Sequence, residues 1–229
     1  MSTLTFAANG APRPSGLGRT TALLVIDLDV ATASPDSGFG RRLRELGRST
    51  DYFRARLEQI IPVVSELAER VRQSGGPVVW VRPEFRRPDA RDWPSSYRAS
   101  VAGLGFEEPM HEGVPGFEML PGLAVDEADG QVTKKCISAF WGGTAGSILR
   151  NRGVTDVLMC GCMTNTGVLV NAVDATGNGF RTTVIDDGCA ALSAEVHEAS
   201  LELMSPMYAR APADEIEATA TTEQEECVR

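Results

Sequence analysis

The sequence has little positive charge for its size and no long hydrophobic run. Its 229 residues carry 22 Lys and Arg against 31 Asp and Glu, which gives a formal net charge of −9. This balance argues against binding to a nucleic-acid backbone, which depends on clustered Lys and Arg. No run approaches the roughly 18 apolar residues of a membrane span, and the N-terminus lacks a basic region followed by a continuous apolar stretch. We therefore expect a cytoplasmic protein that binds neither nucleic acid nor membranes.

Cysteine and histidine are too few and too scattered for a disulfide framework or a metal site. The five cysteines are an odd number and stand in apolar segments, which favours reduced thiols. Cys160 and Cys162 are separated by one residue, whereas the cysteine pairs of zinc sites usually leave two or more. The two histidines, His111 and His197, show no ligand spacing around them. We expect neither a metal nor a cofactor.

The sequence also lacks an obvious linker and any internal repeat, so a single domain is expected. Hydrophobic residues make up 42% of the chain and charged residues 23%, the composition of an ordinary globular protein with a substantial core. Residues 1–20 are rich in Gly, Pro, Ala and Ser and predict a flexible N-terminal arm. We expect the domain to cover residues 21–212 and an acidic, mobile C-terminal tail to cover residues 213–229.

Short apolar runs alternate with segments of helical periodicity. Between about Thr50 and Ser74, apolar residues recur at three- and four-residue steps, which predicts a helix with one buried face. The other predicted helices cover residues 143–153, 164–179 and 193–205, and the predicted strands cover residues 21–27, 77–82, 130–135, 154–161 and 180–187. Strands that alternate with helices in this way form right-handed crossover units. The pattern predicts an α/β fold of three layers, α/β/α, with a mainly parallel central sheet.

The stretch from Pro83 to Gly130 has no regular periodicity. Its six prolines stand at positions 83, 88, 94, 109, 115 and 121. Long irregular stretches in compact domains are usually functional lids or rims. We expect this loop-like region to border a pocket.

Ligands of an open parallel sheet bind beyond the carboxyl ends of its strands. The residues that follow the predicted strands are Asp27, Arg82, Lys134 with Lys135, Cys160 to Asn165, and Asp186 with Asp187. Spacing alone leaves each of them a structural explanation, such as a helix cap or a solvated charge.

Three motifs resemble those of a known family. They read LLVIDLD, TKKCISAF followed by GT, and MCGCMTNTGVLVNAVDATGNGF. Their order and approximate spacing are similar to those of the isochorismatase-like hydrolases, also called the cysteine hydrolase family. The resemblance covers the chain from about Thr21 to about Ala211 and implies the isochorismatase-like fold.

The resemblance also implies a catalytic set. In the family this set comprises an acid after the first strand, a lysine four residues before the serine of the SAF segment, and a cysteine that begins a late helix. The first two roles fall on Asp27 and Lys134. The third position is occupied by Gly167, so the thiolate that would form an acyl-enzyme is missing.

Members of the family that lack this cysteine cleave a vinyl ether. They are the isochorismatases proper and the aminodeoxyisochorismate hydrolases of phenazine pathways, and this chain resembles them. Their reaction can proceed by protonation of the enol-ether carbon and capture of the oxocarbenium ion by water. The resemblance therefore favours a hydrolase of secondary metabolism that acts on a small anionic substrate such as isochorismate, with Gly167 leaving room for substrate or water.

Four further residues are expected in the pocket: Met163, Cys162, Arg82 and Phe140. The resemblance implies that the peptide joining Cys162 to Met163 is cis and that the Met163 N–H binds developing negative charge. Arg82 is a candidate second anchor because its planar fork suits carboxylates, although a place on the surface rim explains it equally well. Asp29 adds an acid where the family often has Gln.

Two other functions stay open. One is an amide or carbamoyl hydrolase that uses water directly or a relocated thiol such as that of Cys162. The other is an inactive member retained for binding or assembly. The metal motif of the nicotinamidase branch is missing, which argues against that activity. Because the family usually forms dimers or higher assemblies, we expect a homodimer or a higher homo-oligomer.

Overall fold

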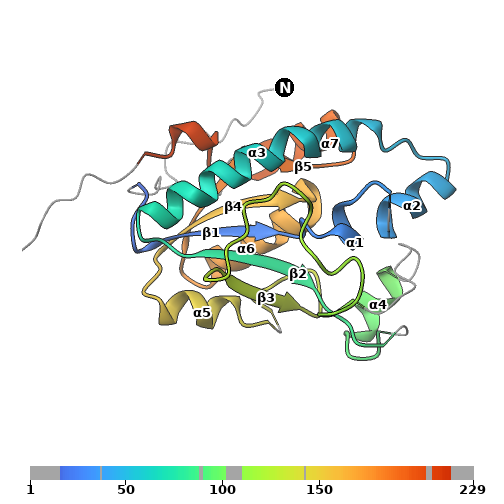
Figure 1. The fold of residues 1–229 in the computed structure, drawn as a ribbon, viewed down its shortest axis with the longest axis horizontal. Coiled ribbons are helices and arrows are strands. Elements are labelled where there is room, and N and C mark those ends of the chain that lie inside the picture. The colour runs from blue at the N-terminus through green and yellow to red at the C-terminus, as the bar shows by residue number, and fades with distance from the viewer. Residues whose placement is uncertain are drawn as a thin grey trace, which may run out of the picture.

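A six-stranded parallel sheet forms the middle layer of the domain (Figure 1). The structure is a computed structural model that describes residues 16–36, 38–87, 90–101, 110–141, 143–204 and 208–217. The sheet has the order β3-β2-β1-β4-β5-β6, and all neighbouring strands are parallel. The strands are β1 Thr21–Ile26, β2 Val78–Pro83, β3 Gly130–Lys134, β4 Asp156–Cys162, β5 Arg181–Ala190 and β6 Ala209–Ala211.

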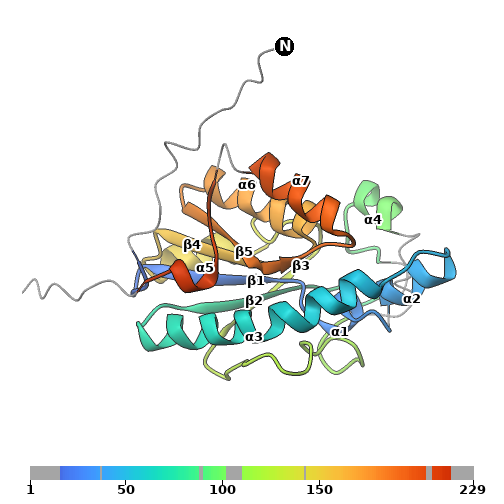
Figure 2. The same cartoon turned by 90° about the horizontal axis from the view of Figure 1, so that it is seen from above.

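Helices cover both faces of this sheet, which confirms the predicted three-layer α/β/α fold. The helices are α1 Val30–Ala33, α2 Gly38–Glu45, α3 Asp51–Gln73, α4 Ser95–Val101, α5 Ala145–Asn151, the π-helix η1 Thr164–Val168, α6 Leu169–Gly177, α7 Ala194–Met204 and the 3-10 helix η2 Ala213–Glu215. Figure 2 shows α3 on one side of the sheet and α6 with α7 on the other. None of the described helices is long and apolar enough to cross a membrane.

The predicted core elements form because their side chains are buried on the expected faces. All six residues of β1 are buried, as a strand in the middle of a covered parallel sheet requires. One face of α3 buries its apolar residues at helical spacing, from Phe53 to Val71. These elements supply much of the larger of the two hydrophobic clusters found among the described residues.

The structure adds one helix to residues 83–130, which the sequence predicts to be mostly loop-like. The helix α4 lies within this stretch, where seven residues after Pro94 have no apolar periodicity that could have revealed it. The short elements α1, α2 and β6 were not predicted either. Elements this short carry too few residues for a periodic signal.

Contacts at both chain ends extend the packed region beyond residues 21–212. The Leu17 N–H donates to the Glu217 carbonyl at 2.7 Å, and Leu17 and Ile216 are both buried in the core. Residues 1–15 and 218–229, which make up most of the predicted arm and tail, lie outside the described residues.

The strand order changes direction between β1 and β4. The strands β2 and β3 follow on one side of β1, whereas β5 and β6 follow on the far side of β4. In doubly wound sheets, a change of this kind separates the loops that leave the two central strands and opens a crevice at their carboxyl ends. Asp27 and Met163 are the first residues after these two strands.

Candidate active site

Asp27 leaves β1 in an unusual backbone conformation. Its φ is +53°, and its N–H donates to the Val81 carbonyl of β2 at 2.8 Å. Few residues other than glycine adopt a positive φ, and Asp tolerates it better than most. This turn places the Asp27 carboxyl group at the carboxyl end of the sheet, beside the point where the strand order changes.

Lys134 ends β3 and forms a buried pair with Asp27. Its Nζ lies 2.7 Å from Asp27 Oδ2 and donates a second hydrogen bond to the Ile137 carbonyl at 2.8 Å. The two residues are only 2% and 7% exposed. The structure thus brings together two residues that stand 107 positions apart in the sequence.

The surroundings of Asp27 favour its protonated form. Burial raises the pKa of Asp27 above its ordinary value, and the positive charge of Lys134 only partly opposes this effect. Its second oxygen, Oδ1, is buried without a hydrogen-bond partner in the described part of the chain. A carboxyl group in this state can hold a proton and deliver it to a bound molecule.

Gly167 faces this pair from η1. The Val168 N–H donates to the Met163 carbonyl at 3.1 Å, five residues back, which is the wide turn of a π-helix. A Cβ atom added to Gly167 would lie 3.2 Å from Asp27 Oδ2 and 2.8 Å from the Cys162 carbonyl oxygen. The position is therefore tight, and the absence of a side chain on Gly167 keeps the surroundings of the Asp27 carboxyl group uncrowded.

Cys162 and Met163 connect β4 to η1. The peptide bond between them is cis, as the resemblance implied. The Cys162 thiol is fully buried and donates to the Asp27 carbonyl at 3.0 Å. Burial, and then the negative charge of Asp27, raise the pKa of Cys162 well above its ordinary value. A buried thiol that stays protonated is a poor nucleophile, so the structure opposes a relocated nucleophile at Cys162.

The structure separates Arg82 from the Asp27–Lys134 pair. In the register between β2 and β3, Arg82 lies opposite Thr133 and Pro83 lies opposite Lys134. Because successive side chains of a strand point to opposite faces, Arg82 and Lys134 lie on different faces of the sheet. Arg82 donates instead to the Phe117 carbonyl and to Gln131, at 2.8 and 2.9 Å.

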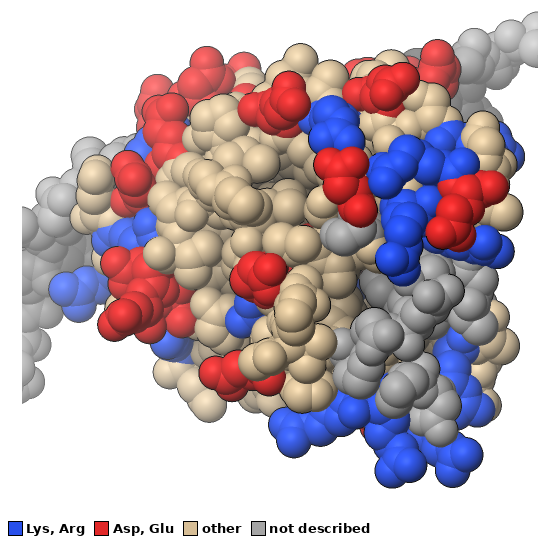
Figure 3. Space-filling view, turned by 45° about the vertical axis from the view of Figure 1, so that its right-hand side comes forward, with Lys and Arg blue, Asp and Glu red and all other residues tan. Residues whose placement is uncertain are grey.

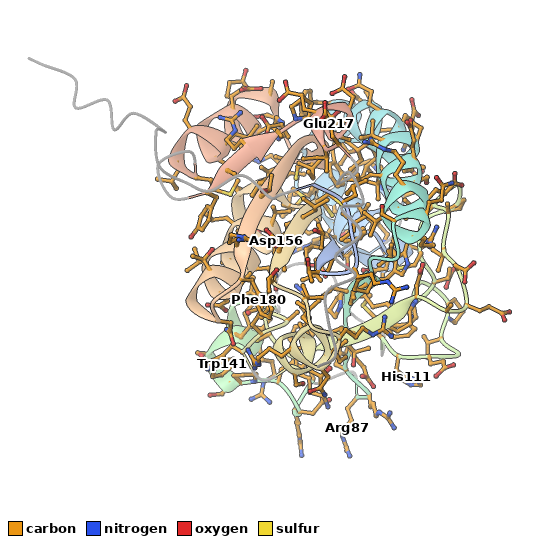
Figure 4. All side chains as sticks on the ribbon, turned by 90° about the vertical axis from the view of Figure 1, so that its left-hand side faces the viewer. Arg87, His111, Trp141, Asp156, Phe180 and Glu217 are labelled. Atoms are coloured by element: carbon orange, nitrogen blue, oxygen red, sulfur yellow. The ribbon has the colours of Figure 1, made fainter. Side chains whose placement is uncertain are left out.

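A cavity of about 870 Å³ opens beside Arg82 on this other face. Its lining includes Glu84, His111 and Phe117, so the stretch from Pro83 to Gly130 does border a pocket, as expected. Figure 4 shows His111 on the side of α3, whereas Phe180 lies on the side of α6. The cavity is therefore on the opposite side of the sheet from the Asp27–Lys134 pair.

Phe140 follows the segment that contacts Lys134 and Asn171 through Ile137 and Ala139. Its ring packs against Phe180, with the ring centroids 6.0 Å apart. Asp29 has a structural role, because its Oδ1 accepts from the Thr32 N–H at 2.8 Å and caps α1. Burial, and then the charge of Asp27, raise the pKa of Asp29 to about 7.

Sequence reasoning missed Asn171, which holds the site together. This buried side chain donates to the carbonyls of Gly167 and Ile137, at 2.8 and 3.1 Å, and accepts from the Ala139 N–H at 2.8 Å. It therefore joins the start of the late helix to the segment whose carbonyl holds Lys134. A single Asn inside the apolar run of residues 167–173 is the signal that could have revealed it.

A second missed network supports the start of η1. The buried ring of His197 on α7 lies 3.0 Å from the Thr164 hydroxyl and 3.4 Å from an Arg56 nitrogen. Burial, and then the charge of Arg56, lower the pKa of His197, which favours the neutral ring. Because a guanidinium only donates, Nε2 accepts from Arg56, and Nδ1 carries the proton towards Thr164. The network fixes the residue that follows Met163.

The structure brings Asp27, Lys134 and Gly167 together at the carboxyl end of the sheet. The sequence profile of the isochorismatase domain matches residues 21–213. The chain belongs to the isochorismatase family. Members of the family that resemble this chain include hydrolases, and this chain is a hydrolase of the same family. Among the residues that the structure describes, no group of three or more His, Cys, Asp or Glu is arranged to hold a metal ion.

The family members that are similar to this chain have different names. A probable inactive nicotinamidase of Arabidopsis thaliana is 30% identical over 85% of this chain and 92% of its own length. Maleamate amidohydrolase of Pseudomonas putida is 28% identical over 81% of this chain and 79% of its own. The crystal structure of an isochorismatase family protein from Desulfovibrio vulgaris is similar in fold, with a TM-score of 0.70 and 25% identity, over 86% of this chain and 96% of that one.

Proposed function

We propose that this isochorismatase-family hydrolase cleaves a small anionic substrate without a covalent intermediate, and that the scissile bond is a vinyl ether like that of isochorismate. The observation that carries the proposal is the absence of a side chain at Gly167. This position adjoins Asp27 Oδ2, the family resemblance places a cysteine there, and Cys162 offers no reactive thiol in its stead. The carboxyl group of Asp27 and the ammonium group of Lys134 then remain as the reactive groups.

The proposed reaction begins with a proton transfer from Asp27 to the terminal carbon of the enol ether. The π electrons form the new C–H bond, and the ether oxygen shares the positive charge of the oxocarbenium ion. Water adds to the cationic carbon and returns one proton to the Asp27 carboxylate. The hemiketal then breaks its bond to the ether oxygen, which takes the hydroxyl proton and leaves as an alcohol, and a 2-oxo acid is formed.

Lys134 has two roles in this reaction. Its ammonium group, 2.7 Å from Asp27, stabilises the carboxylate that forms when the proton leaves. A substrate carboxylate bound beside Lys134 would offset the positive charge that Asp27 experiences, and so would favour the protonated acid before the reaction. An anionic substrate therefore fits this pair better than a neutral one.

The distribution of charge supports an anionic substrate as well. Between Gly38 and Arg56 the sequence has six arginines and only two acidic residues, although the whole chain is acidic. Figure 3 shows Lys and Arg side chains gathered on the side of the molecule where α2 and α4 lie, beyond the carboxyl ends of the strands. Several of them pair with neighbouring acids such as Asp36 and Glu45. The excess that remains would attract anions towards this end of the sheet.

Amide hydrolysis is the second candidate, and a specific observation favours it. The similar maleamate amidohydrolase matches over most of this chain, and its name denotes an enzyme that acts on an amide. A water molecule held at Gly167 could attack an amide directly, with Asp27 as the general base. A raised pKa increases the share of Asp27 that is protonated, and only the vinyl-ether reaction starts from that form, so we favour the vinyl ether.

We expect that turnover does not require a cysteine thiol. Cys162→Ser keeps a hydrogen-bond donor next to the Asp27 carbonyl, and we expect turnover of isochorismate to stay within a few-fold of the unmodified enzyme. Treatment with a thiol-alkylating reagent should have an equally small effect, because the described cysteines are buried. Steady-state kinetics measures both. A loss of more than about a thousandfold, the scale expected when a covalent nucleophile is removed, would contradict the proposal.

A further inference from the structure

The helix α4 stands over the carboxyl ends of β2 and β3 (Figure 1). Figure 2 shows it on the same side of the sheet as α6 and α7. Gly167 precedes α6, and a Cβ atom on it would lie 3.2 Å from the Asp27 oxygen that Lys134 binds, so this pair belongs to the same side. The helix α4 therefore lies on the side of the sheet that carries the Asp27–Lys134 pair.

Three polar contacts anchor the segment that leads into α4. The Glu84 N–H donates to the carbonyl of Lys134 itself at 2.9 Å, and the Trp93 indole N–H donates to the Glu84 carbonyl at 2.6 Å. The ammonium group of Lys135 pairs with Asp92 at 2.7 Å. Glu84 thus links Trp93 to the end of β3, the strand that carries Lys134.

Trp93 in turn fixes the ring of Tyr97. The Trp93 ring meets Phe85 edge to face, with centroids 5.1 Å apart, and both residues are buried. The Tyr97 ring stacks on the other side of Trp93 at 5.2 Å, with 25° between the ring planes. An aromatic ring held in such a stack loses little further freedom when its hydroxyl group binds a ligand.

The Tyr97 hydroxyl is available to a ligand. No hydrogen bond to it is found among the described residues, and the side chain is only partly buried. Burial, and then the negative charge of Asp27, raise the pKa of Tyr97, so the phenol remains a hydrogen-bond donor.

We propose that Tyr97 is a substrate-binding residue whose hydroxyl donates a hydrogen bond to an oxygen of a small carboxylic acid held over the Asp27–Lys134 pair. Lys134 contacts the ligand from the sheet, and Tyr97 contacts it from α4. The inference rests on the location of the proposed active site, but it does not depend on which bond is cleaved. It makes α4 the element that selects an oxygen-bearing substrate.

Tyr97→Phe tests this inference, because it keeps the aromatic stack and removes only the hydroxyl. The dissociation constants of two probes are measured by calorimetry. Pyruvate is the 2-oxo acid that vinyl-ether cleavage would release, and maleate is the diacid that amide cleavage of maleamate would release. We expect Tyr97→Phe to weaken binding of the probe that the unmodified protein holds by about tenfold, as loss of one hydrogen bond predicts. The matched control is Tyr52→Phe on α3, with an exposed side chain, and it should change nothing.

Each outcome of the two titrations bears on the inference. Equal affinity in Tyr97→Phe, or no binding of either probe to the unmodified protein, would overturn the role of Tyr97. Weaker binding of pyruvate in the variant supports both this role and the vinyl-ether reaction. Binding of maleate alone, weakened in the variant, supports the role of Tyr97 and counts against the vinyl ether.

Discussion

Asp27→Asn is expected to lower the turnover number by about 10²- to 10⁴-fold, the contribution of general acid catalysis. Asparagine keeps the shape of the side chain and an oxygen that can accept from Lys134, but it cannot donate an acidic proton. The proposed mechanism also predicts that the rate of the unmodified enzyme falls as pH rises through the raised pKa of Asp27, because only the protonated form reacts. The residual rate of the variant should lack this dependence. Steady-state kinetics between pH 5 and 9 measures both effects.

The matched control for this variant is Asp29→Asn. Asp29 is also a buried carboxyl group, but it caps α1, and asparagine is an equally good cap. Asp27→Asn replaces the carboxyl partner of the buried Lys134 by a neutral amide, and disrupting a buried ion pair can cost about 3–5 kcal/mol of stability, so thermal unfolding of both variants is needed to show that they fold. Near-normal turnover by a folded Asp27→Asn protein would show that Asp27 is not the acid.

Gly167→Cys is expected to lower the turnover number by about 10- to 100-fold. The same substitution restores the cysteine that the family resemblance places at this position. The new Cβ would lie 2.8 Å from the Cys162 carbonyl and 3.2 Å from Asp27 Oδ2. The first contact is with backbone and forces a shift, and extra volume in a packed position typically costs about 1–3 kcal/mol. The introduced thiol, next to Lys134 and the start of a helix, should have a lowered pKa and should react readily with electrophiles. Turnover and thiol titration are measured on the same sample.

Gly177→Cys provides the control at the other end of α6. A Cβ atom there meets nothing within 4 Å, so this variant adds a thiol without crowding, and its turnover should be unchanged. Gly167→Ala separates the effect of volume from that of sulfur, and it should also slow the reaction. If Gly167→Cys turned over isochorismate at the normal rate with a thiol that titrates as reactive, the absence of a side chain at Gly167 would have no part in catalysis.

The sequence predicted those elements whose burial leaves a periodic or continuous apolar pattern. The strand β1 and the helix α3 are of this kind, and the resemblance of three motifs added the Asp27, Lys134 and Gly167 positions that the structure brings together. Helix α4 could not be predicted, because it is short and its aromatic residues pack on one another and on loop residues. The contacts of Arg82 and Phe140 could not be predicted from the sequence either. They depend on which face of a strand, and which neighbouring segment, each side chain points towards.

Buried polar residues such as Asn171 and His197 were missed for a different reason. Their partners are mostly far apart in sequence, as in the contacts of His197 with Thr164 and Arg56. A single sequence contains no spacing rule that joins such residues. Only the folded arrangement shows that they support the start of η1, on which Gly167 stands.

Hydrolysis of isochorismate in D₂O is the most direct test of non-covalent vinyl-ether cleavage. If Asp27 delivers a solvent-derived proton to the terminal carbon, the pyruvate formed at early times should carry one deuterium in its methyl group, and the mass of the intact protein should not change. Unlabelled pyruvate incubated with the enzyme in D₂O corrects for exchange after release. Absence of pyruvate, or a covalent adduct on the protein during turnover, would contradict the proposed mechanism.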